Sequence, residues 1–277
     1  MYKLLCANFA RLWKNKVFWG EMAAMLTFSI VIMFNGCRQA IADASSGYRY
    51  VLDHYYFSMA PMLGLFCAIF TSLYLGTEYA DGAIRNKLIV GHGRAGIYLA
   101  NLMVSYAATL LFALAWLAGG LVGIPTLGTW QIGYAGLACY VGLIALFALA
   151  LSAIFTFVGM AFSGKATSAV CSMLLYLGLL VWASMVYNSL CQPEMSSGII
   201  MTAEGMRMSE PSPNPDYIGG NLRNAYEFVL DLLPTGQGIL MTNVEIARPL
   251  RMGLCSVTIT VIMTLCGLIL FDKKDLK

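Results

Sequence analysis

Apolar residues along the chain fall into six long runs that are separated by more polar segments. The runs cover residues 17–36, 57–77, 97–124, 133–162, 167–190 and 250–271. Each run reaches the roughly 20 residues that a helix needs to cross the hydrocarbon core of a bilayer. The pattern therefore predicts an all-α polytopic membrane protein, with six transmembrane helices in a single transmembrane domain of residues 1–277.

The composition supports this class of protein. Hydrophobic residues make up 59% of the 277 residues, and charged residues make up only 11%. A soluble core of this size could not enclose so much apolar side chain. The net charge of +3 is small and gives no indication of a nucleic-acid partner.

Residues 1–16 predict a helix that lies in the membrane interface. Cations alternate there with leucines and aromatic residues at helical spacing, and the cations are Lys3, Arg11, Lys14 and Lys16. The competing interpretation is a signal peptide, because residues 40–42 resemble a cleavage site. The first apolar run contains Glu21, which a signal sequence would avoid, so we expect an uncleaved first helix.

The positions of the lysines predict the orientation. With six helices, one side of the membrane carries both termini, residues 78–96 and the turn near residue 165. All lysines fall on that side: Lys3, Lys14, Lys16, Lys87, Lys165, Lys273, Lys274 and Lys277. Because short cytoplasmic segments are enriched in positive charge, we expect both termini in the cytoplasm.

The loop of residues 78–96 is polar and positively charged, and its sequence predicts a short helix. Asp81 is the expected N-cap, and Gly91 stands where helices commonly end with a positive φ. Ile84 and Leu88 lie four residues apart on one face, which we expect to pack against protein. The polar side chains expected to point away from it are Arg85, Asn86 and Lys87.

The segment 191–249 predicts a small extracellular cap before the last helix. It begins with prolines and glycines that resist regular structure. Apolar residues then recur at helical spacing before Pro234, and they are Leu222, Tyr226, Val229, Leu230 and Leu233. Residues 231–238 indicate a helix end and a turn, and residues 238–244 a short segment that dips into the outer leaflet.

The membrane runs contain no charged residue near their centres, and nothing in the chain forms a catalytic or metal-binding set. His54 and His92 fall on opposite sides of the predicted membrane, and no nucleotide-binding motif is complete. We therefore expect a protein that is not itself an enzyme. Cys37 and Cys191 both fall at outer helix ends, and a disulfide between them is a possibility that the sequence leaves open.

Small and hydroxyl-bearing residues are frequent within the membrane runs. Ala115, Gly119 and Gly123 form a ladder at four-residue spacing, which predicts close packing against another helix. The serines and threonines either line a pathway or bond to their own helices, and the sequence does not separate these alternatives.

One motif carries a resemblance to a known family. It reads Glu78-Tyr79-x-x-Gly82-x-Ile84-Arg85-Asn86-Lys87-Leu88, followed by Gly91-His92 and Ile97-Tyr98-Leu99. This stretch resembles the inner-loop signature of ABC-2 type permeases, the membrane subunits of bacterial ATP-binding-cassette exporters. The helix order, the interfacial helix and residues 231–237 are also similar to that family, so the resemblance covers essentially the whole chain. Ala83 departs from it, since many relatives have Thr there.

The resemblance implies that Asp81–Val90 is a coupling helix that sits in a groove of a separate ATPase subunit. The residues it assigns to ATPase coupling are Glu78, Asp81, Gly82, Ile84, Arg85, Asn86, Lys87, Leu88 and Gly91. Arg85 and Lys87 would pair with acidic groups of the ATPase. Glu78 would either pair with a basic neighbour such as Arg85 or remain a solvated cap.

The expected function follows from this resemblance. Two permease subunits, identical or related, would assemble with two ATPase subunits in the bacterial plasma membrane and export a substrate. An antimicrobial peptide or another amphiphile is one candidate. ATP and Mg²⁺ would be bound by the ATPase, so this chain itself would need no cofactor. The alternative function is a non-transporting immunity or sensor protein that binds a peptide at its outer segment.

Overall fold

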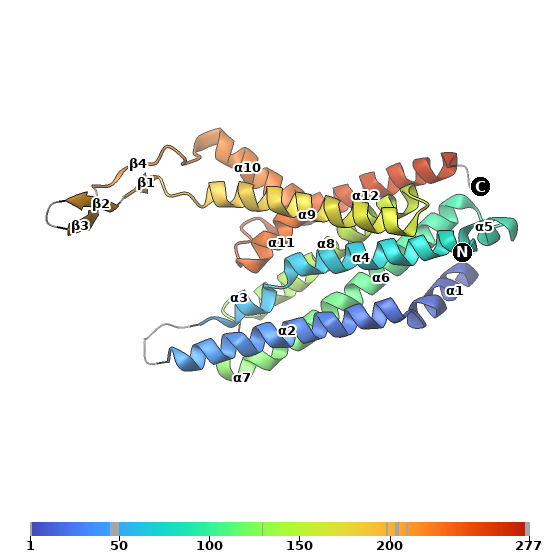
Figure 1. Ribbon diagram of the computed structural model, residues 1–277, viewed down its shortest axis with the longest axis horizontal. Coiled ribbons are helices and arrows are strands. Elements are labelled where there is room, and N and C mark those ends of the chain that lie inside the picture. Colours follow the sequence, from blue (N-terminus) through green and yellow to red (C-terminus); the bar gives the residue numbers. More distant parts are fainter. Residues whose placement is uncertain are drawn as a thin grey trace.

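The computed structural model of the chain describes residues 2–44, 50–128, 130–197, 199–202, 205–208 and 210–274. Long helices run side by side in an elongated bundle, and both chain termini lie at the same end (Figure 1). We call this the N/C end; the opposite end, with α3, α7 and the strands, is the far end. Lys277 falls outside the described residues. The seven described lysines lie in α1 and α5 or at or next to the helix ends that meet at the N/C end.

Within the described residues, six helical stretches are long and apolar enough to cross a membrane, which makes this a multi-pass membrane protein. They are Lys16–Ala42 (α2), Leu52–Ala80 (α3, Leu52–Phe57, and α4, Ala60–Ala80), Arg94–Leu127 (α6, Arg94–Gly120; η1, Leu121–Gly123; and α7, Ile124–Leu127), Gly133–Ala161 (α8), Lys165–Leu190 (α9) and Pro249–Lys273 (α12). All six predicted runs are confirmed, although α2 continues to Ala42, beyond its predicted end at residue 36.

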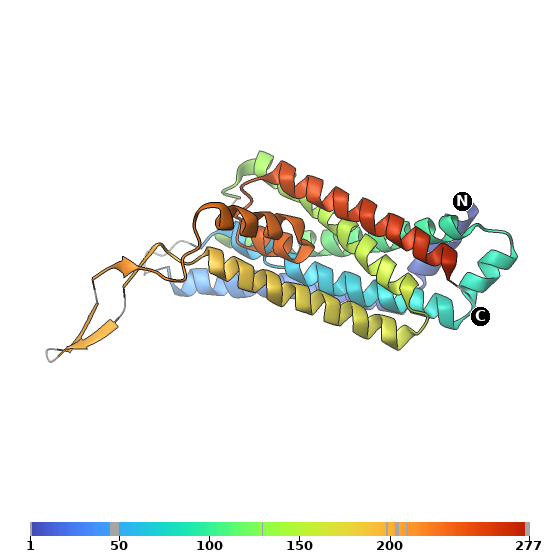
Figure 2. The same ribbon diagram turned by 90° about the horizontal axis from the view of Figure 1, so that it is seen from above.

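The other elements lie at the two ends of the bundle. They are α1 (Tyr2–Trp13), α5 (Ala83–Ile89), α10 (Gly220–Leu232), α11 (Pro234–Thr242), and the strands β1 (Met195–Ser196), β2 (Ile199–Thr202), β3 (Gly205–Met208) and β4 (Ser212–Pro213). The strands form the antiparallel pairs β1–β4 and β2–β3 in an arm that projects from the far end (Figure 2). Regular structure was not expected in this part of the segment 191–249.

Helix α4 lies at the centre of the bundle and packs against α6, α8 and α9. Helix α2 packs on α6, and α12 packs on α8. Most residues in the apolar stretches of α3–α4, α6–α7 and α8 are buried, whereas those of α2, α9 and α12 are largely exposed. In water such apolar surface would be unfavourable, so these three helices present the faces suited to lipid or to another membrane subunit.

The small-residue ladder on α6 packs against α2, as predicted. A Cβ at Gly119 would lie 2.9 Å from Cβ of Ser29, so only glycine allows the two helices to approach so closely. Ser29 Oγ donates a hydrogen bond to the carbonyl of Trp116 at 2.8 Å, which fixes this contact in place.

Several membrane hydroxyls donate to their own helices, four residues back. Thr109 Oγ1 donates to the carbonyl of Ser105 at 2.8 Å, and Ser152 Oγ donates to the carbonyl of Ala148 at 2.7 Å. Ser152 Oγ also lies 3.2 Å from Thr109 Oγ1, and Thr109 Oγ1 lies 3.1 Å from Cys67 Sγ. For these residues the hydroxyls join α4, α6 and α8 in the core.

The amphipathic segment at the far end is confirmed as α10, but its end differs from the prediction. Leu230 is buried and Tyr226 is partly buried against α9, whereas Leu222 is exposed. Pro234 begins a new helix, α11, because proline suits the first position of a helix. The turn expected at residues 231–238 is therefore wrong: the chain bends at Leu233, and residues 234–239 are buried in α11.

The disulfide that the sequence left open is absent. Cys37 and Cys191 are both free, as are the other six cysteines. Cys37 lies on α2, which packs on α6, and Cys191 follows α9, which packs on α4. The two thiols thus belong to helices that pack on different neighbours in the bundle.

Candidate functional site

The polar loop at the N/C end contains the predicted short helix, α5, but Asp81 is not its N-cap. The Asp81 amide donates to the carbonyl of Thr77 at 2.9 Å, so Asp81 caps the C-terminus of α4. Gly82 follows with φ 66°, a conformation that glycine adopts without steric cost, and it precedes the first residue of α5. The change of direction at Gly82 is what separates the two helices.

Gly91 ends α5 as predicted. Its φ is 94°, its amide donates to the carbonyl of Leu88 at 2.9 Å, and the His92 amide donates to the carbonyl of Lys87 at 3.1 Å. This pair of bonds is a Schellman motif, which satisfies the last carbonyls of the helix. The C-terminus of α5 is therefore capped, even though the helix is short.

The two faces of α5 differ in exposure. Ile84 is buried and Leu88 packs against the core, as predicted. Arg85 is exposed, as predicted. Two residues that the sequence analysis did not single out, Ile89 and Val90, have exposed fractions of 76% and 77%. Adjacent exposed apolar residues in a polar loop were a signal for a contact surface.

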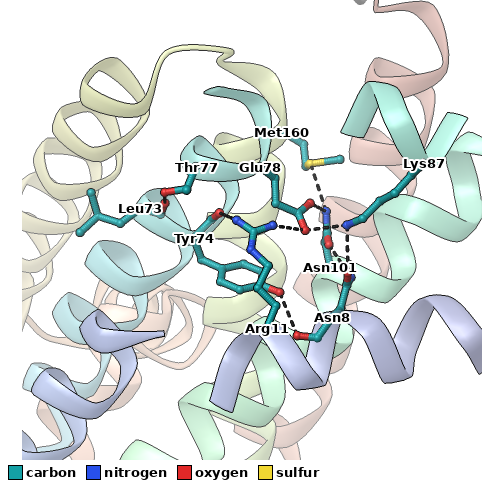
Figure 3. Close-up of polar contacts among 9 residues, drawn as sticks. All are labelled: Asn8, Arg11, Leu73, Tyr74, Thr77, Glu78, Lys87, Asn101 and Met160. Atoms are coloured by element: carbon teal, nitrogen blue, oxygen red, sulfur yellow. Dashed lines mark hydrogen bonds and ion pairs between the residues drawn. The ribbon is translucent and has the colours of Figure 1, made fainter. Parts of the chain in front are cut away.

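Lys87, by contrast, turns inward to Glu78, so the prediction that it points away from the protein is wrong (Figure 3). Lys87 Nζ lies 2.6 Å from Glu78 Oε1, and the Lys87 side chain is 15% exposed. Arg11 Nη1 lies 2.7 Å from the same oxygen, and the Glu78 side chain is fully buried. Glu78 is neither paired with Arg85 nor a solvated cap: its partners are Lys87 and Arg11.

Two asparagines complete the polar contacts of these ion pairs. Asn101 Nδ2 donates to Glu78 Oε2 at 2.9 Å, which occupies the second carboxylate oxygen. Asn8 Nδ2 donates to Asn101 Oδ1 at 2.8 Å, and Asn8 Oδ1 accepts from Lys87 Nζ at 2.9 Å. A closed ring of hydrogen bonds thus connects residues from α1, α4, α5 and α6.

Tyr74, which lies on α4 one turn before Glu78, contacts α1. Its hydroxyl donates to the carbonyl of Asn8 at 3.1 Å, and the Arg11 guanidinium lies 4.8 Å from the centre of its ring. We refer to these six residues as the Glu78 cluster, and they are Asn8, Arg11, Tyr74, Glu78, Lys87 and Asn101.

The cluster contains two cations and one carboxylate in a largely buried place. Burial lowers the pKa of Lys87 below its ordinary value, although the Glu78 carboxylate opposes this shift by favouring the charged amine. A buried carboxylate with several donors is stable only while its partners remain, and removing one leaves an uncompensated charge. The cluster therefore acts as a rigid junction between α5 and the helices of the bundle.

Of this cluster, the sequence assigned only Glu78 and Lys87 to the site, and it predicted Arg11 only as a cation of the interfacial helix. A carboxylate at the end of an apolar run needs a partner, and this was a signal that Glu78 is paired. Lys87 also follows Ile84 by three residues, which places it on the buried face of α5. Asn8, Arg11 and Asn101 lie far from Glu78 in the sequence, and no local pattern pairs them with it.

Among the described residues, no group of three His, Cys, Asp or Glu could hold a metal ion. His54 belongs to α3 at the far end, and His92 follows α5 at the N/C end. Short polar contacts connect the exposed short helix α5 to buried residues of the membrane helices.

Comparison with known proteins adds no family to this description. The chain matches no family model, and no curated protein matches it. The resemblance to ABC-2 type permeases therefore remains a prediction from the residues quoted above.

Proposed function

We propose that this chain is the permease subunit of an ATP-binding-cassette exporter and that α5 is its coupling helix. The observation that carries the proposal is the construction of α5. Arg85, Ile89 and Val90 are exposed on a capped helix, while Lys87 of the same helix is fixed to buried Glu78. A solvated loop needs neither the exposed apolar pair nor the internal anchor.

The Glu78 cluster supports a mechanical route for coupling. A displacement of α5 acts first on Lys87, whose ammonium contacts Glu78 on α4 and Asn8 on α1. Glu78 then transmits the displacement to Asn101 on α6. Because these contacts are short and buried, α1, α4 and α6 follow α5 as one body, and a partner that moves α5 changes the packing of the bundle.

In this proposal the energy comes from a separate ATPase subunit, which binds ATP and Mg²⁺. Arg85 pairs with acidic groups of that subunit, and Ile89 and Val90 enter an apolar groove on it. The N/C end then faces the cytoplasm of a bacterial cell, in agreement with the lysines at that end. A second permease subunit and membrane lipid cover the exposed faces of α2, α9 and α12.

The substrate proposed for export is an amphiphile such as an antimicrobial peptide. The contrasting function is an immunity or sensor protein that binds a peptide at the far end without transporting it. That function has no role for an ATPase at α5, and this difference separates the two by experiment.

The test is to isolate the chain from membranes of its own cell under mild conditions and identify what co-purifies. We expect an ATP-binding-cassette ATPase in equal amount, and ATP hydrolysis that the isolated chain lacks. Vesicles containing the complex should move substrate only with ATP and Mg²⁺. A chain that purifies without an ATPase, yet still protects cells from a peptide, would support the contrasting function instead.

A further inference from the structure

A cavity of about 590 Å³ lies at the far end, between the end of α9, α10, the end of α11 and the start of α12. Leu190, Leu230 and Leu240 form its apolar lining. Six charged residues also line it: Arg223, Glu227, Asp231, Glu245, Arg248 and Arg251. Its volume lies within the range of about 300–1,000 Å³ that is typical of small-molecule sites.

One wall of the cavity carries an excess positive charge. Arg248 Nη1 lies 3.0 Å from Glu227 Oε2, and Arg223 Nε lies 3.5 Å from Glu227 Oε1. A single carboxylate cannot neutralise two guanidinium groups, so one positive charge remains. The Arg248 side chain is 47% exposed, which leaves donors free for a ligand. Arg251 forms a separate ion pair with Asp231 and contributes no excess.

Another part of the lining carries an excess negative charge. Glu245 Oε2 accepts a hydrogen bond from the Tyr187 hydroxyl at 2.9 Å. The hydroxyl is neutral, and in the described part of the chain no Lys or Arg forms an ion pair with Glu245. The cavity thus presents one uncompensated cation and one uncompensated anion together with apolar lining residues.

The cavity also lies where lipid can reach it. It opens at the ends of two membrane helices, α9 and α12, whose neighbouring residues Met185, Leu250 and Leu254 are exposed. Such residues suit contact with acyl chains in a bilayer, and the charged residues of the cavity would then lie near the level of the headgroups.

We propose that this cavity binds a zwitterionic phospholipid headgroup that contains a phosphodiester and a primary ammonium, as in phosphatidylethanolamine. Arg248 and Arg223 bind the phosphate, because guanidinium groups donate two parallel hydrogen bonds to phosphate oxygens. Glu245 accepts hydrogen bonds from the ammonium. The leucines contact the glycerol and the first carbons of the acyl chains. This inference is independent of the transport function proposed above.

The test uses the full chain, purified in detergent and stripped of lipid, with native mass spectrometry to count bound lipids. Phosphatidylethanolamine, phosphatidylcholine and phosphatidylglycerol are added in equal amounts. We expect phosphatidylethanolamine to be retained most, because the quaternary amine of phosphatidylcholine donates no hydrogen bond and phosphatidylglycerol has no cation for Glu245. Inorganic phosphate and glycerophosphoethanolamine serve as soluble competitors, and the latter should compete much more strongly because it also offers an ammonium to Glu245.

Three variants assign the contacts. Arg248→Ala should weaken binding of phosphatidylethanolamine about tenfold, the equivalent of about 1.4 kcal/mol. Glu245→Gln should remove the preference over phosphatidylglycerol while leaving phosphatidylglycerol binding unchanged. Arg38→Ala, an exposed arginine on α2 away from the cavity, is the control and should bind as the wild type does.

Equal retention of the three lipids by the wild-type chain would overturn the proposal without reference to any variant. So would an unchanged preference in both Arg248→Ala and Glu245→Gln. Competition by inorganic phosphate alone, as strong as that by glycerophosphoethanolamine, would show a simple anion site and would also contradict it.

Discussion

Lys87 Nζ lies 2.6 Å from Glu78 Oε1, and this contact joins the exposed helix α5 to the buried end of α4. The Glu78 side chain is fully buried, so its charge depends on protein partners rather than on water. Arg11 and Asn101 supply the remaining contacts and bring α1 and α6 to the same carboxylate. The stability of this corner of the molecule therefore depends on one acidic residue.

Substitutions around Glu78 should differ sharply in cost. Glu78→Gln leaves two partly buried cations without an acid and should lower the free energy of unfolding by about 3–5 kcal/mol. Lys87→Ala leaves Glu78 paired with Arg11 and should cost about 1–3 kcal/mol. Arg85→Ala, two residues away and exposed, should stay within about 0.5 kcal/mol. Unfolding of each variant in detergent, followed by tryptophan fluorescence, measures this order.

The order itself is the test. If Glu78→Gln unfolds at the same temperature as Arg85→Ala, the Glu78 cluster does not hold α5 to the bundle, and the coupling route loses its physical basis.

The stability of the contact between α4 and α9 should depend on side-chain volume at Gly64. A methyl group at Gly64 would overlap the ring of buried Tyr176, so Gly64→Ala should cost about 1–3 kcal/mol. Gly178→Ala, on the same helix as Tyr176, meets nothing within 4 Å and should add about 0.5–1 kcal/mol of stability. Melting temperatures of the two variants should move in opposite directions; a shared direction would contradict this packing.

Glu21 on α2 differs from Glu78 in its hydrogen bonding. Both of its carboxylate oxygens are buried, and neither has a hydrogen-bond partner among the residues that the structure describes. Glu21→Met, which keeps the volume and removes the carboxylate, should raise the free energy of unfolding by about 1–3 kcal/mol. The same thermal measurement checks it. A loss of stability would show that Glu21 has a partner outside the single chain, such as a second copy or a bound cation.

The membrane helices were predictable because hydropathy depends on composition over some 20 residues, and the six runs are long and nearly free of charge. The end of α5 was predictable from Gly91 alone. The inward position of Lys87 differs from the prediction, because its spacing along α5 and not its charge decides which face it lies on. Ile84, Lys87 and Leu88 stand at positions i, i+3 and i+4, which lie on one face of the helix. The aliphatic stem of a lysine packs well against such apolar neighbours.

The rest of the site could not come from local patterns. Arg11 and Glu78 are joined by the path of the whole chain, which returns α4 to the level of α1 at the N/C end. The start of α11 at Pro234 was ambiguous for a different reason. Proline both ends one helix and begins another, and only the burial of residues 234–239 decides between a turn and a helix.

Orientation can be tested by labelling in intact cells, after the native cysteines are replaced. A cysteine at Arg85, which is exposed on α5, should react only with thiol reagents that cross the membrane. A cysteine at Asp216, exposed near the far end, should react with reagents that do not cross it. The reverse result would place the N/C end outside the cell and would separate α5 from any cytoplasmic ATPase.

The central claim, that α5 docks into an ATPase, is tested most directly at its exposed residues. The double variant Arg85→Glu, Val90→Asp reverses one charge and removes one apolar contact without touching the Glu78 cluster. Its melting temperature should equal that of the wild type, because both side chains are exposed. Arg38→Glu, at the far end of α2, is the matched control for charge reversal.

The decisive measurement is the affinity of the co-purifying ATPase for each variant in lipid discs, together with ATP hydrolysis by the complex. We predict that the double variant binds the ATPase at least about tenfold more weakly, a change of about 1.4 kcal/mol or more. Hydrolysis in response to substrate should disappear, while Arg38→Glu should behave as the wild type does. Full affinity and full hydrolysis in the double variant would contradict the assignment of α5 as the coupling helix.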